Sequence, residues 1–164
     1  MLIRPNAQDE PPFGEFDDKR IVPRFNAAPT QTLPIMRRTP SGMELSTMRW
    51  GLVPSWAKDK KIGNAMINAR AETVAEKPGY RSAFAKRRCL VPADGFYEWQ
   101  KRDGEKVPHF IHLKTDEPFV FAGLWEFWPV EKLETLTIVT TTPNKLMASL
   151  HDRMPVILTS AAAE

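Results

Sequence analysis

Proline is the residue that most restricts how this chain can fold. The sequence holds 15 prolines and only 8 glycines. The proline ring fixes φ and removes a backbone donor, so proline breaks helix interiors and is confined to edges or irregular points of sheets. Prolines at this frequency favour many short segments with abrupt ends over long helices.

Seven segments have the apolar or alternating pattern that is typical of β-strands. They are residues 43–50, 88–91, 95–100, 109–113, 119–125, 136–141 and 155–158. Pro92 is predicted to end the second of them, and Asp103-Gly104 predicts a hairpin turn after the third. Strand-like residues therefore outnumber helical ones.

Few segments favour helix. Residues 78–86 predict one or two turns, and Thr142-Pro143 predicts the start of a short helix over NKLMASL, because proline is favoured at the first helical position. Ser160, followed by Ala-Ala-Ala-Glu, predicts the start of another. We expect one mainly-β α+β domain over residues 23–164, preceded by a divergent or truncated arm over residues 1–22.

The apolar runs are too short to cross a membrane. The longest, Phe119–Trp125, is strand-sized, whereas a spanning helix needs roughly 18 apolar residues. The N-terminal MLIRPNAQDEPP carries acids and has no apolar core, unlike a signal peptide. A single cysteine excludes an internal disulfide framework and a Cys-rich zinc site. We expect a soluble cytoplasmic protein without a membrane partner, metal or other cofactor.

The positive charge is concentrated in the middle of the chain. The formal net charge is only +3, yet residues 37–88 carry 12 Lys and Arg against 4 Asp and Glu. A basic segment in a chain with five tryptophans indicates a polyanion partner such as nucleic acid. A solvated basic face is the simpler interpretation.

Cys89 is the only thiol of the chain. A cysteine nucleophile needs a base, and His151 is the obvious candidate. However, Cys89 stands in the short apolar run Arg-Arg-Cys-Leu-Val-Pro, where a free cysteine usually acts as a small buried hydrophobic residue. We expect a structural Cys89 and keep a thiol peptidase built on Cys89 and His151 as an alternative.

The three histidines differ in their settings. His109 and His112 are three residues apart in a strand pattern, so they face opposite sides and do not share a metal. His151 stands in Leu-His-Asp-Arg-Met-Pro, between a predicted short helix and a predicted strand. Polar junctions of this kind often hold site residues, although a histidine bonded to its own turn has the same pattern.

Two further segments hold candidate site residues. Glu98 follows Phe96 on one strand face, and aromatic neighbours that exclude water suit a carboxyl that exchanges protons, although a surface glutamate has the same pattern. Asn68 and Arg70 share a face if their segment is extended, where they suit a phosphate or sugar. Asn68 could equally cap a helix, and Arg70 could pair with Glu72.

Two tryptophans, Trp50 and Trp56, stand near basic residues and suit base stacking, although core packing explains Trp50 equally well. No single candidate is decisive, but their order along the chain is informative. It resembles the SOS-response-associated peptidase-like (SRAP) family of abasic-site processing proteins in six motifs over roughly residues 23–158. The motifs are PRFNAAPT (23–30), RWGLVPSW (49–56), NARAET (68–73), RCLVPADGFYEW (88–99), AGLW (122–125) and HDRMPVIL (151–158).

The resemblance implies a twisted or barrel-like antiparallel sheet with a groove for single-stranded DNA that contains abasic sites. It implies a DNA–protein crosslink in which an N-terminal cysteine condenses with the sugar aldehyde to a thiazolidine. By motif, Asn68 would position the reacting end, Glu98 would act as general acid–base, and His151 would assist proton transfer. Arg70 would hold a DNA phosphate, and Trp56 and Arg153 would lie near the groove.

The chain departs from the family pattern at both ends. It begins Met1-Leu2-Ile3-Arg4, whereas family members begin Met-Cys-Gly-Arg, and Cys89 is not N-terminal. Family members usually continue well beyond Ser160, and we expect this domain to lack that C-terminal extension. We expect a monomer that acts on abasic sites in the DNA damage (SOS) response and associates with the nucleoid when bound to DNA. Because the N-terminal cysteine is absent from this sequence, we expect no stable crosslink. The alternative is a noncovalent single-stranded-DNA-binding remnant.

Overall fold

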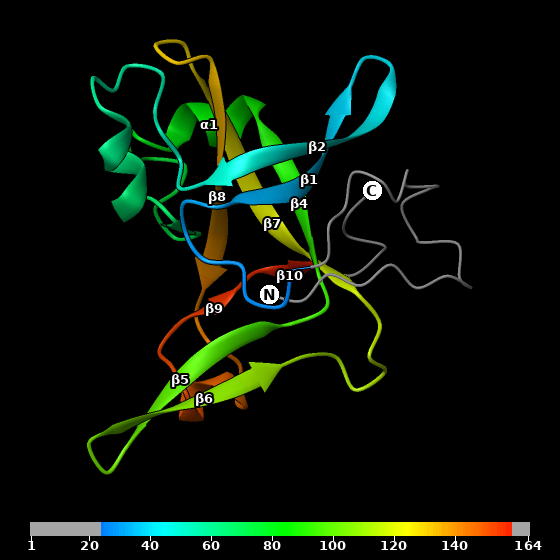
Figure 1. Ribbon diagram of the computed structural model, residues 1–164, viewed down its shortest axis with the longest axis vertical. Helices are drawn as coiled ribbons and strands as arrows, with labels where there is room; N and C mark the ends of the chain where they lie inside the picture. Colours follow the sequence, from blue (N-terminus) through cyan, green and yellow to red (C-terminus); the bar gives the residue numbers. More distant parts are fainter. Residues whose placement is uncertain (1–23, 159–164) are drawn as a thin grey trace.

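Five strands of the computed structural model close into a ring (Figure 1). The structure describes residues 24–158. Each strand of the ring pairs with the next, and β7 pairs with β8 to close it. In order around the ring the strands are β7 (Phe119–Trp128), β4 (Arg88–Ala93), β1 (Thr32–Thr39), β2 (Gly42–Trp50) and β8 (Leu133–Thr141). The expected mainly-β, barrel-like fold is confirmed.

The ring is mixed rather than wholly antiparallel. Strands β2 and β8 pair in parallel, with Arg49 opposite Thr135 and Trp50 opposite Leu136. The other four pairs of the ring are antiparallel. The direction in which two strands pair depends on how the chain returns to the sheet, which local alternation does not encode. The antiparallel expectation therefore holds for all but this contact of the ring.

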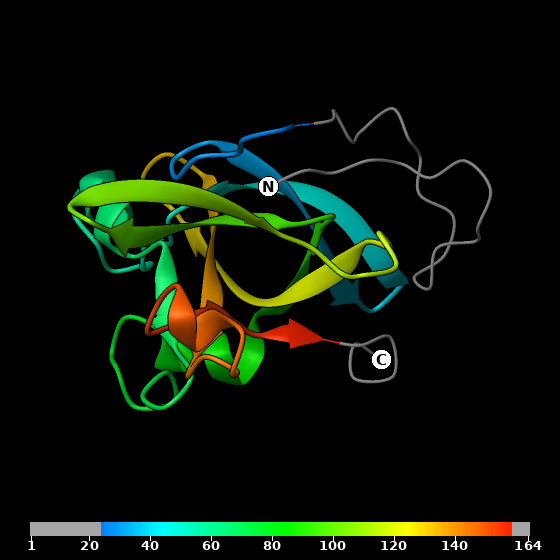
Figure 2. The same cartoon turned by 90° about the horizontal axis from the view of Figure 1, so that it is seen from below.

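Within the described residues, three short strands, a two-stranded hairpin and three short helices lie outside the ring. The added strands are β3 (Asn68–Arg70), β9 (Met154–Pro155) and β10 (Ile157–Leu158), and β5 (Phe96–Arg102) and β6 (Glu105–Ile111) form a separate hairpin. The helices are the 3₁₀ helix η2 (Lys60–Ala65), α1 (Arg81–Lys86) and the 3₁₀ helix η3 (Met147–Ser149). Figure 2 shows the hairpin crossing one side of the ring. The hairpin turn at Asp103-Gly104 is as predicted, with positive φ at both residues.

The inside of the ring is the main hydrophobic core. Its fully buried members come from every strand of the ring and include Leu33, Ile35, Met48, Val91, Phe121 and Leu136. Phe96 of the hairpin packs edge-on against Phe121, with ring centroids 5.7 Å apart. Burial of such side chains supplies the main driving force for folding, at roughly 1.5–3 kcal/mol each. The hairpin is therefore anchored to the ring at its base.

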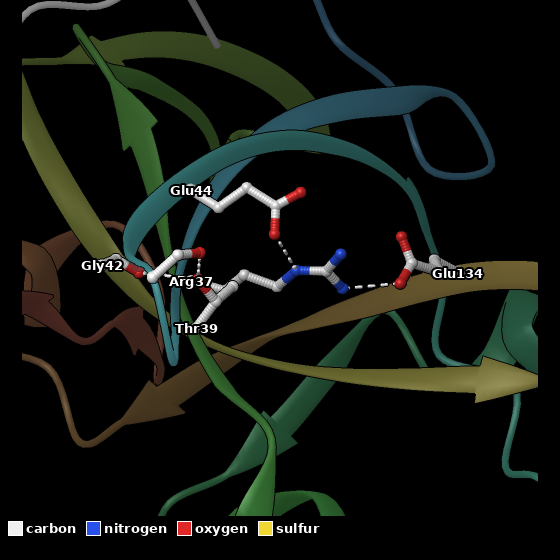
Figure 3. Close-up of polar contacts among 6 residues, drawn as sticks. Arg37, Thr39, Gly42, Glu44 and Glu134 are labelled. Carbon is white, nitrogen blue, oxygen red and sulfur yellow. Dashed lines mark hydrogen bonds and ion pairs between the residues drawn. The ribbon is translucent and has the colours of Figure 1, made fainter.

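Arg37 contacts residues of three other strands of the ring, and Figure 3 shows its two carboxylate partners, Glu44 and Glu134. From β1, its Nη1 donates to Glu134 Oε1 on β8 at 2.6 Å, and its Nε donates to Glu44 Oε2 on β2 at 3.3 Å. The guanidinium also lies 4.7 Å from the ring centroid of Trp125 on β7. Arginine suits this position because its planar fork bonds two carboxylates while its flat face stacks on an aromatic ring.

Proline was misjudged at two points of the sheet. Residues 32–39 were not predicted as a strand, yet Pro34 lies within β1, and Pro92 lies within β4 instead of ending it. The ladder between β1 and β4 registers only the pair Met36–Leu90. Pro34 and Pro92 thus each pair with one strand, β2 and β7 respectively, and the missing N–H costs no ladder bond on the other side.

The helix predictions were right in part. α1 lies within the predicted residues 78–86. The predicted helix from Thr142-Pro143 is wrong, because only the three residues of η3 are helical. Asn144, not Thr142, begins the turn: its Oδ1 accepts from the Met147 amide at 2.9 Å. The predicted arm over residues 1–22 and the predicted helix start at Ser160 lie outside the described residues.

Candidate functional site

The C-terminal end of β8 gathers two segments that are distant in sequence. β3 pairs in parallel with β8, with Arg70 opposite Thr140. β9 pairs antiparallel with the same end, with Pro155 opposite Thr140. The β8 end therefore brings Asn68 and Arg70 close to the segment that carries His151 and Arg153.

Asn68 and Arg70 point to the same exposed side of β3. Ala69 between them is fully buried, so the strand alternates as the extended interpretation predicted. The helix-cap interpretation of Asn68 is wrong, because Asn68 begins a strand. Its backbone carbonyl accepts from the Tyr80 hydroxyl at 3.2 Å, and Asn68 is exposed. The two polar side chains are thus presented side by side to solvent.

Arg153 fastens the His151 segment to β8 and β3. Its Nη1 and Nη2 each donate to one carboxylate oxygen of Glu72 at 2.9 Å. Its Nη2 also donates to the Thr140 carbonyl at 2.7 Å. This two-point arginine–carboxylate geometry is the strongest form of surface ion pair. Glu72 therefore pairs with Arg153 and not with Arg70, and Arg153, predicted near a DNA groove, has a structural task as well.

The ion pair shifts the pKa of both groups in the direction that favours their charged forms. The hydrogen bonds from Arg153 lower the pKa of the Glu72 carboxyl below its ordinary 4.5, and a bond to the backbone of Glu72 adds to this. The hydrogen bonds to Glu72 likewise raise the pKa of Arg153. A lowered carboxyl pKa in the folded state stabilises that state above about pH 4.5, and the contribution is lost as the pH falls through the lowered pKa.

We expect Glu72→Gln to lower the Tm near pH 7, and the Tm values of variant and wild type to converge as the pH falls well below 4.5. Thermal unfolding followed by circular dichroism between pH 3 and 7 measures this. Glu76→Gln, on the same exposed turn, is the matched control and should match the wild type throughout. A gap that persists at pH 3 would contradict the assignment.

His151 is held by its own turn through Nδ1. The Arg153 amide donates to His151 Nδ1 at 3.0 Å, and Asp152 Oδ1 lies 3.1 Å from the same nitrogen. In the neutral ring, Nδ1 accepts from Arg153, so the proton sits on Nε2. In the protonated ring, Nδ1–H can donate to Asp152 instead. Nδ1 has a partner in both states, and the side chain is 44% exposed.

Glu98 lies on the inner face of the hairpin. Phe96, Glu98 and Gln100 alternate along one face of β5, and Phe96 is in the core. At the other end, Gln100 Nε2 donates to the Ser149 carbonyl at 3.0 Å, in η3 and two residues before His151. Glu98 lies between these anchors and is half-buried. The hairpin therefore directs Glu98 towards the side where η3 leads into the His151 segment.

The two tryptophans have different surroundings. Trp50 packs against the core and donates from Nε1 to the Ile67 carbonyl at 2.8 Å, so the structural interpretation of Trp50 is confirmed. Trp56 is 62% exposed. Its loop is attached near β3 by the bond from the Leu52 amide to the Met66 carbonyl, 3.1 Å. Trp56 is thus an accessible aromatic ring on an exposed turn.

Cys89 is a core residue, as expected. Its side chain is buried in β4 among the main core, opposite Gly123 of β7. Burial raises the pKa of the Cys89 thiol to about 12, so the thiol is neutral at physiological pH. A thiolate is the nucleophilic form, and a buried neutral thiol cannot supply it. These surroundings argue against a peptidase built on Cys89 and His151.

We expect Cys89 to be inert to Ellman's reagent in the folded protein at pH 8, and to react completely after unfolding in guanidinium. The absorbance of the released thiolate counts the reactive thiols directly. Complete labelling within minutes under native conditions would contradict the burial described above.

Three positioning contacts were not predicted from the sequence: Glu72 with Arg153, Thr140 with Arg153, and Gln100 with Ser149. Glu72 lies inside the motif NARAET, which drew attention to this segment, but its partner Arg153 is 81 residues away in the sequence. Gln100 shares the face of Glu98 on β5, and its contact with Ser149 joins positions 49 residues apart. Their roles depend on pairing between distant segments, which no local pattern reports.

Two searches of the described part of the chain bear on cofactors and membranes. No group of three or more His, Cys, Asp or Glu within residues 24–158 could hold a metal ion. None of the helices within the same range is long and apolar enough to cross a membrane.

Comparison with known proteins gives consistent matches. The model of the family described as SOS response associated peptidase (SRAP) matches residues 4–164. The abasic site processing protein YoqW of Bacillus subtilis is 49% identical over 164 residues, covering 90% of this chain and 73% of YoqW. The abasic site processing protein HMCES of Xenopus tropicalis is 32% identical over 181 residues, covering 90% of this chain and 54% of HMCES.

A solved structure agrees with the fold. A protein from Bacteroides thetaiotaomicron superposes with a TM-score of 0.75 at 32% identity. The alignment covers 82% of this chain and 61% of that protein, so this chain spans about three fifths of its length. The family match extends through every segment gathered at the β8 end. The chain therefore belongs to the SOS response associated peptidase (SRAP) family.

Proposed function

We propose that this protein processes abasic sites in single-stranded DNA at the C-terminal end of β8. The observation that carries the proposal is the meeting of β3 and the His151 segment at Thr140. The names of the relatives, which are abasic site processing proteins, support the substrate class. The basic character of residues 37–88 suits a polyanion.

Recognition of the DNA falls to Arg70, Asn68 and Trp56. The exposed Arg70 guanidinium can bond a phosphate at two points, and the Asn68 amide can both donate to and accept from the opened sugar. The exposed ring of Trp56 offers a stacking surface for an unpaired base, which is available only where the DNA is single-stranded.

Chemistry falls to Glu98 and His151. The ring-opened sugar of an abasic site carries an aldehyde, to which a primary amine of the protein adds to give a carbinolamine. The hydroxyl leaves as water when Glu98 supplies a proton, while His151 accepts the proton that the nitrogen loses. The product is an imine, C=N, and one water is released. Both residues act as general acid–base groups.

The stable crosslink requires more than an imine. Closure of a thiazolidine needs a thiol next to the reacting amine, as on an N-terminal cysteine. Position 2 of this chain is leucine, and the one cysteine, Cys89, is buried. We therefore propose a reversible imine for the 164-residue polypeptide, with noncovalent DNA binding as the alternative outcome.

The test is a denaturing gel of the polypeptide mixed with single-stranded DNA that carries one abasic site. Borohydride reduces an imine to a stable amine, so we expect a shifted band only with borohydride. Leu2→Cys restores the aminothiol once Met1 is removed, and should give a band without borohydride. No band in either lane, with DNA binding intact, would support the noncovalent alternative, and neither band nor binding would refute the function.

We expect Arg70→Ala to weaken binding to single-stranded DNA about equally for all sequences, and to reduce the slope of log K against log salt by about 0.7–1. Lys132→Ala is the matched control. Lys132 precedes β8, so the nine-residue strand separates it from Thr141 by about 30 Å. Fluorescence anisotropy over a salt series measures both. An unchanged slope for Arg70→Ala would contradict a phosphate contact.

All of the proposed residues belong to one chain, so the proposal needs no second copy and we expect a monomer. A DNA substrate also implies a location with the DNA, which in a bacterium is the nucleoid in the cytoplasm, and the family description connects it with the SOS response.

A further inference from the structure

His109 lies directly opposite Glu98 in the β5–β6 hairpin. Directly opposed residues of an antiparallel pair project from the same face, with their Cβ atoms about 4.5–5.5 Å apart. The half-buried His109 ring therefore stands beside the half-buried Glu98 side chain. The chemistry proposed for Glu98, Asn68 and His151 does not involve the imidazole of His109.

The shared face is the inner face of the hairpin. On one side of the Glu98–His109 pair lies the pair Phe96–Ile111, and both of these residues pack in or against the main core. On the other side lies Gln100, whose amide bonds the Ser149 carbonyl. The anchors at both ends hold the face against the ring and η3, which Figure 1 shows beside the hairpin. The two titratable side chains are therefore enclosed on the side of the candidate site.

One nitrogen of His109 is buried without a partner. Its Nε2 has no accessible surface and no hydrogen bond. His112 is different: its Nδ1 is 2.7 Å from Asp116 Oδ1, and its ring stacks on Phe110 at 5.3 Å. Buried polar atoms of native proteins are nearly always bonded, so an orphaned ring nitrogen beside a candidate acid–base group needs an explanation.

We propose that His109 is a positioning residue for Glu98, an inference that rests on the proposed function. When the abasic sugar occupies the site, His109 Nε2–H donates to one carboxyl oxygen of Glu98. That bond holds the carboxyl in one orientation and leaves the other oxygen to deliver or accept the proton of the reaction. The proton of His109 itself is not transferred, so no further reactant is needed.

The test measures the single-turnover rate of borohydride-trapped adduct formation. His109→Leu should reduce the rate at saturating DNA about tenfold and leave the Kd for DNA unchanged. His109→Gln, whose amide nitrogen reaches the position of Nε2, should restore most of the rate. His112→Gln is the control on the other face and should match the wild type. A His109→Leu rate equal to wild type overturns the proposal.

Coupling to Glu98 separates positioning from a general effect on folding. In a Glu98→Gln background, His109→Leu should cause no further loss, because the group that it orients is gone. A full tenfold loss in that background overturns the proposal. Equal Tm values for wild type and His109→Leu exclude unfolding as the cause of the slower rate. If His109→Leu is unstable, the rate of His109→Gln, expected to be close to that of the wild type, decides whether the Nε2 donor is needed.

A readout without DNA chemistry distinguishes the two hypotheses. Nitrogen-15 NMR of the histidine side chains, with abasic DNA bound, should show the His109 Nε2 signal shifted by Glu98→Gln. An inert wild type refutes the proposed function. If the His109 Nε2 signal is also unchanged by Glu98→Gln, the contact between His109 and Glu98 is refuted. If the signal shifts, the contact is supported and only its role in the reaction is refuted.

Discussion

Glu98→Gln is expected to slow formation of the borohydride-trapped adduct by about 100-fold or more, because a positioned general acid contributes about 10²–10⁴ in rate. Glutamine keeps the shape and the hydrogen-bonding capacity of the side chain but cannot deliver a proton. Binding of single-stranded DNA should stay within about twofold of the wild type, because no phosphate contact is removed. Single-turnover gels measure the rate, and anisotropy measures the affinity.

The hairpin supplies a matched control for Glu98→Gln. Glu105 begins β6 near the turn and is exposed, so Glu105→Gln makes the same chemical change away from the site. It should leave the rate unchanged. Equal rates for Glu98→Gln and wild type would remove Glu98 from the proposed chemistry, and with it the positioning role of His109. Loss of DNA binding in Glu98→Gln would indicate a structural role instead.

Gly51→Ala is expected to lower the free energy of unfolding by at least about 3 kcal/mol, with a fall in Tm of about 6–12 °C. Gly51 has φ +122°, a conformation that L residues rarely adopt. A Cβ at this position would lie 2.6 Å from the Gly63 carbonyl oxygen, so the backbone itself would have to move. Gly63 is equally close in return, with its own Cβ position 2.5 Å from the Gly51 oxygen.

Gly42→Ala separates backbone strain from steric contact. Gly42 has the same φ of +122°, but a Cβ there would meet nothing within 4 Å. It should show the strain alone, about 1–3 kcal/mol. Urea unfolding of the two variants gives both free energies. Equal losses at the two positions would show that the approach of Gly51 to Gly63 adds nothing to the requirement for glycine.

Much of the strand content could be predicted because it has a local cause. The alternation in residues 43–50 and the apolar run 119–125 fall within β2 and β7. The extended interpretation of Asn68 and Arg70 depended only on the period of a strand and is confirmed. Cys89 was expected in the core from its neighbours alone, and it is buried there. The roles proposed for Asn68, Glu98 and His151 remain predictions.

The failures within the sheet arise from how strands pair with one another, which local sequence patterns do not encode. Pro34 and Pro92 break the local rule for strands, yet both lie in strands of the ring because β1 and β4 barely pair with each other. The parallel pairing of β2 with β8 is likewise invisible to alternation, which gives the faces of a strand but neither its neighbour nor its direction.

The sequence by itself therefore determined the family, the mainly-β class, the buried thiol and the faces on which the candidate side chains lie. Those features depend on residue type and short spacing. Only the tertiary structure decided that Glu72 grips Arg153 across 81 residues, that Gln100 reaches Ser149 across 49, and that His109 stands opposite Glu98 with an unpaired nitrogen. Such contacts arise when the ring closes and strands take their register, and they depend on the whole chain at once.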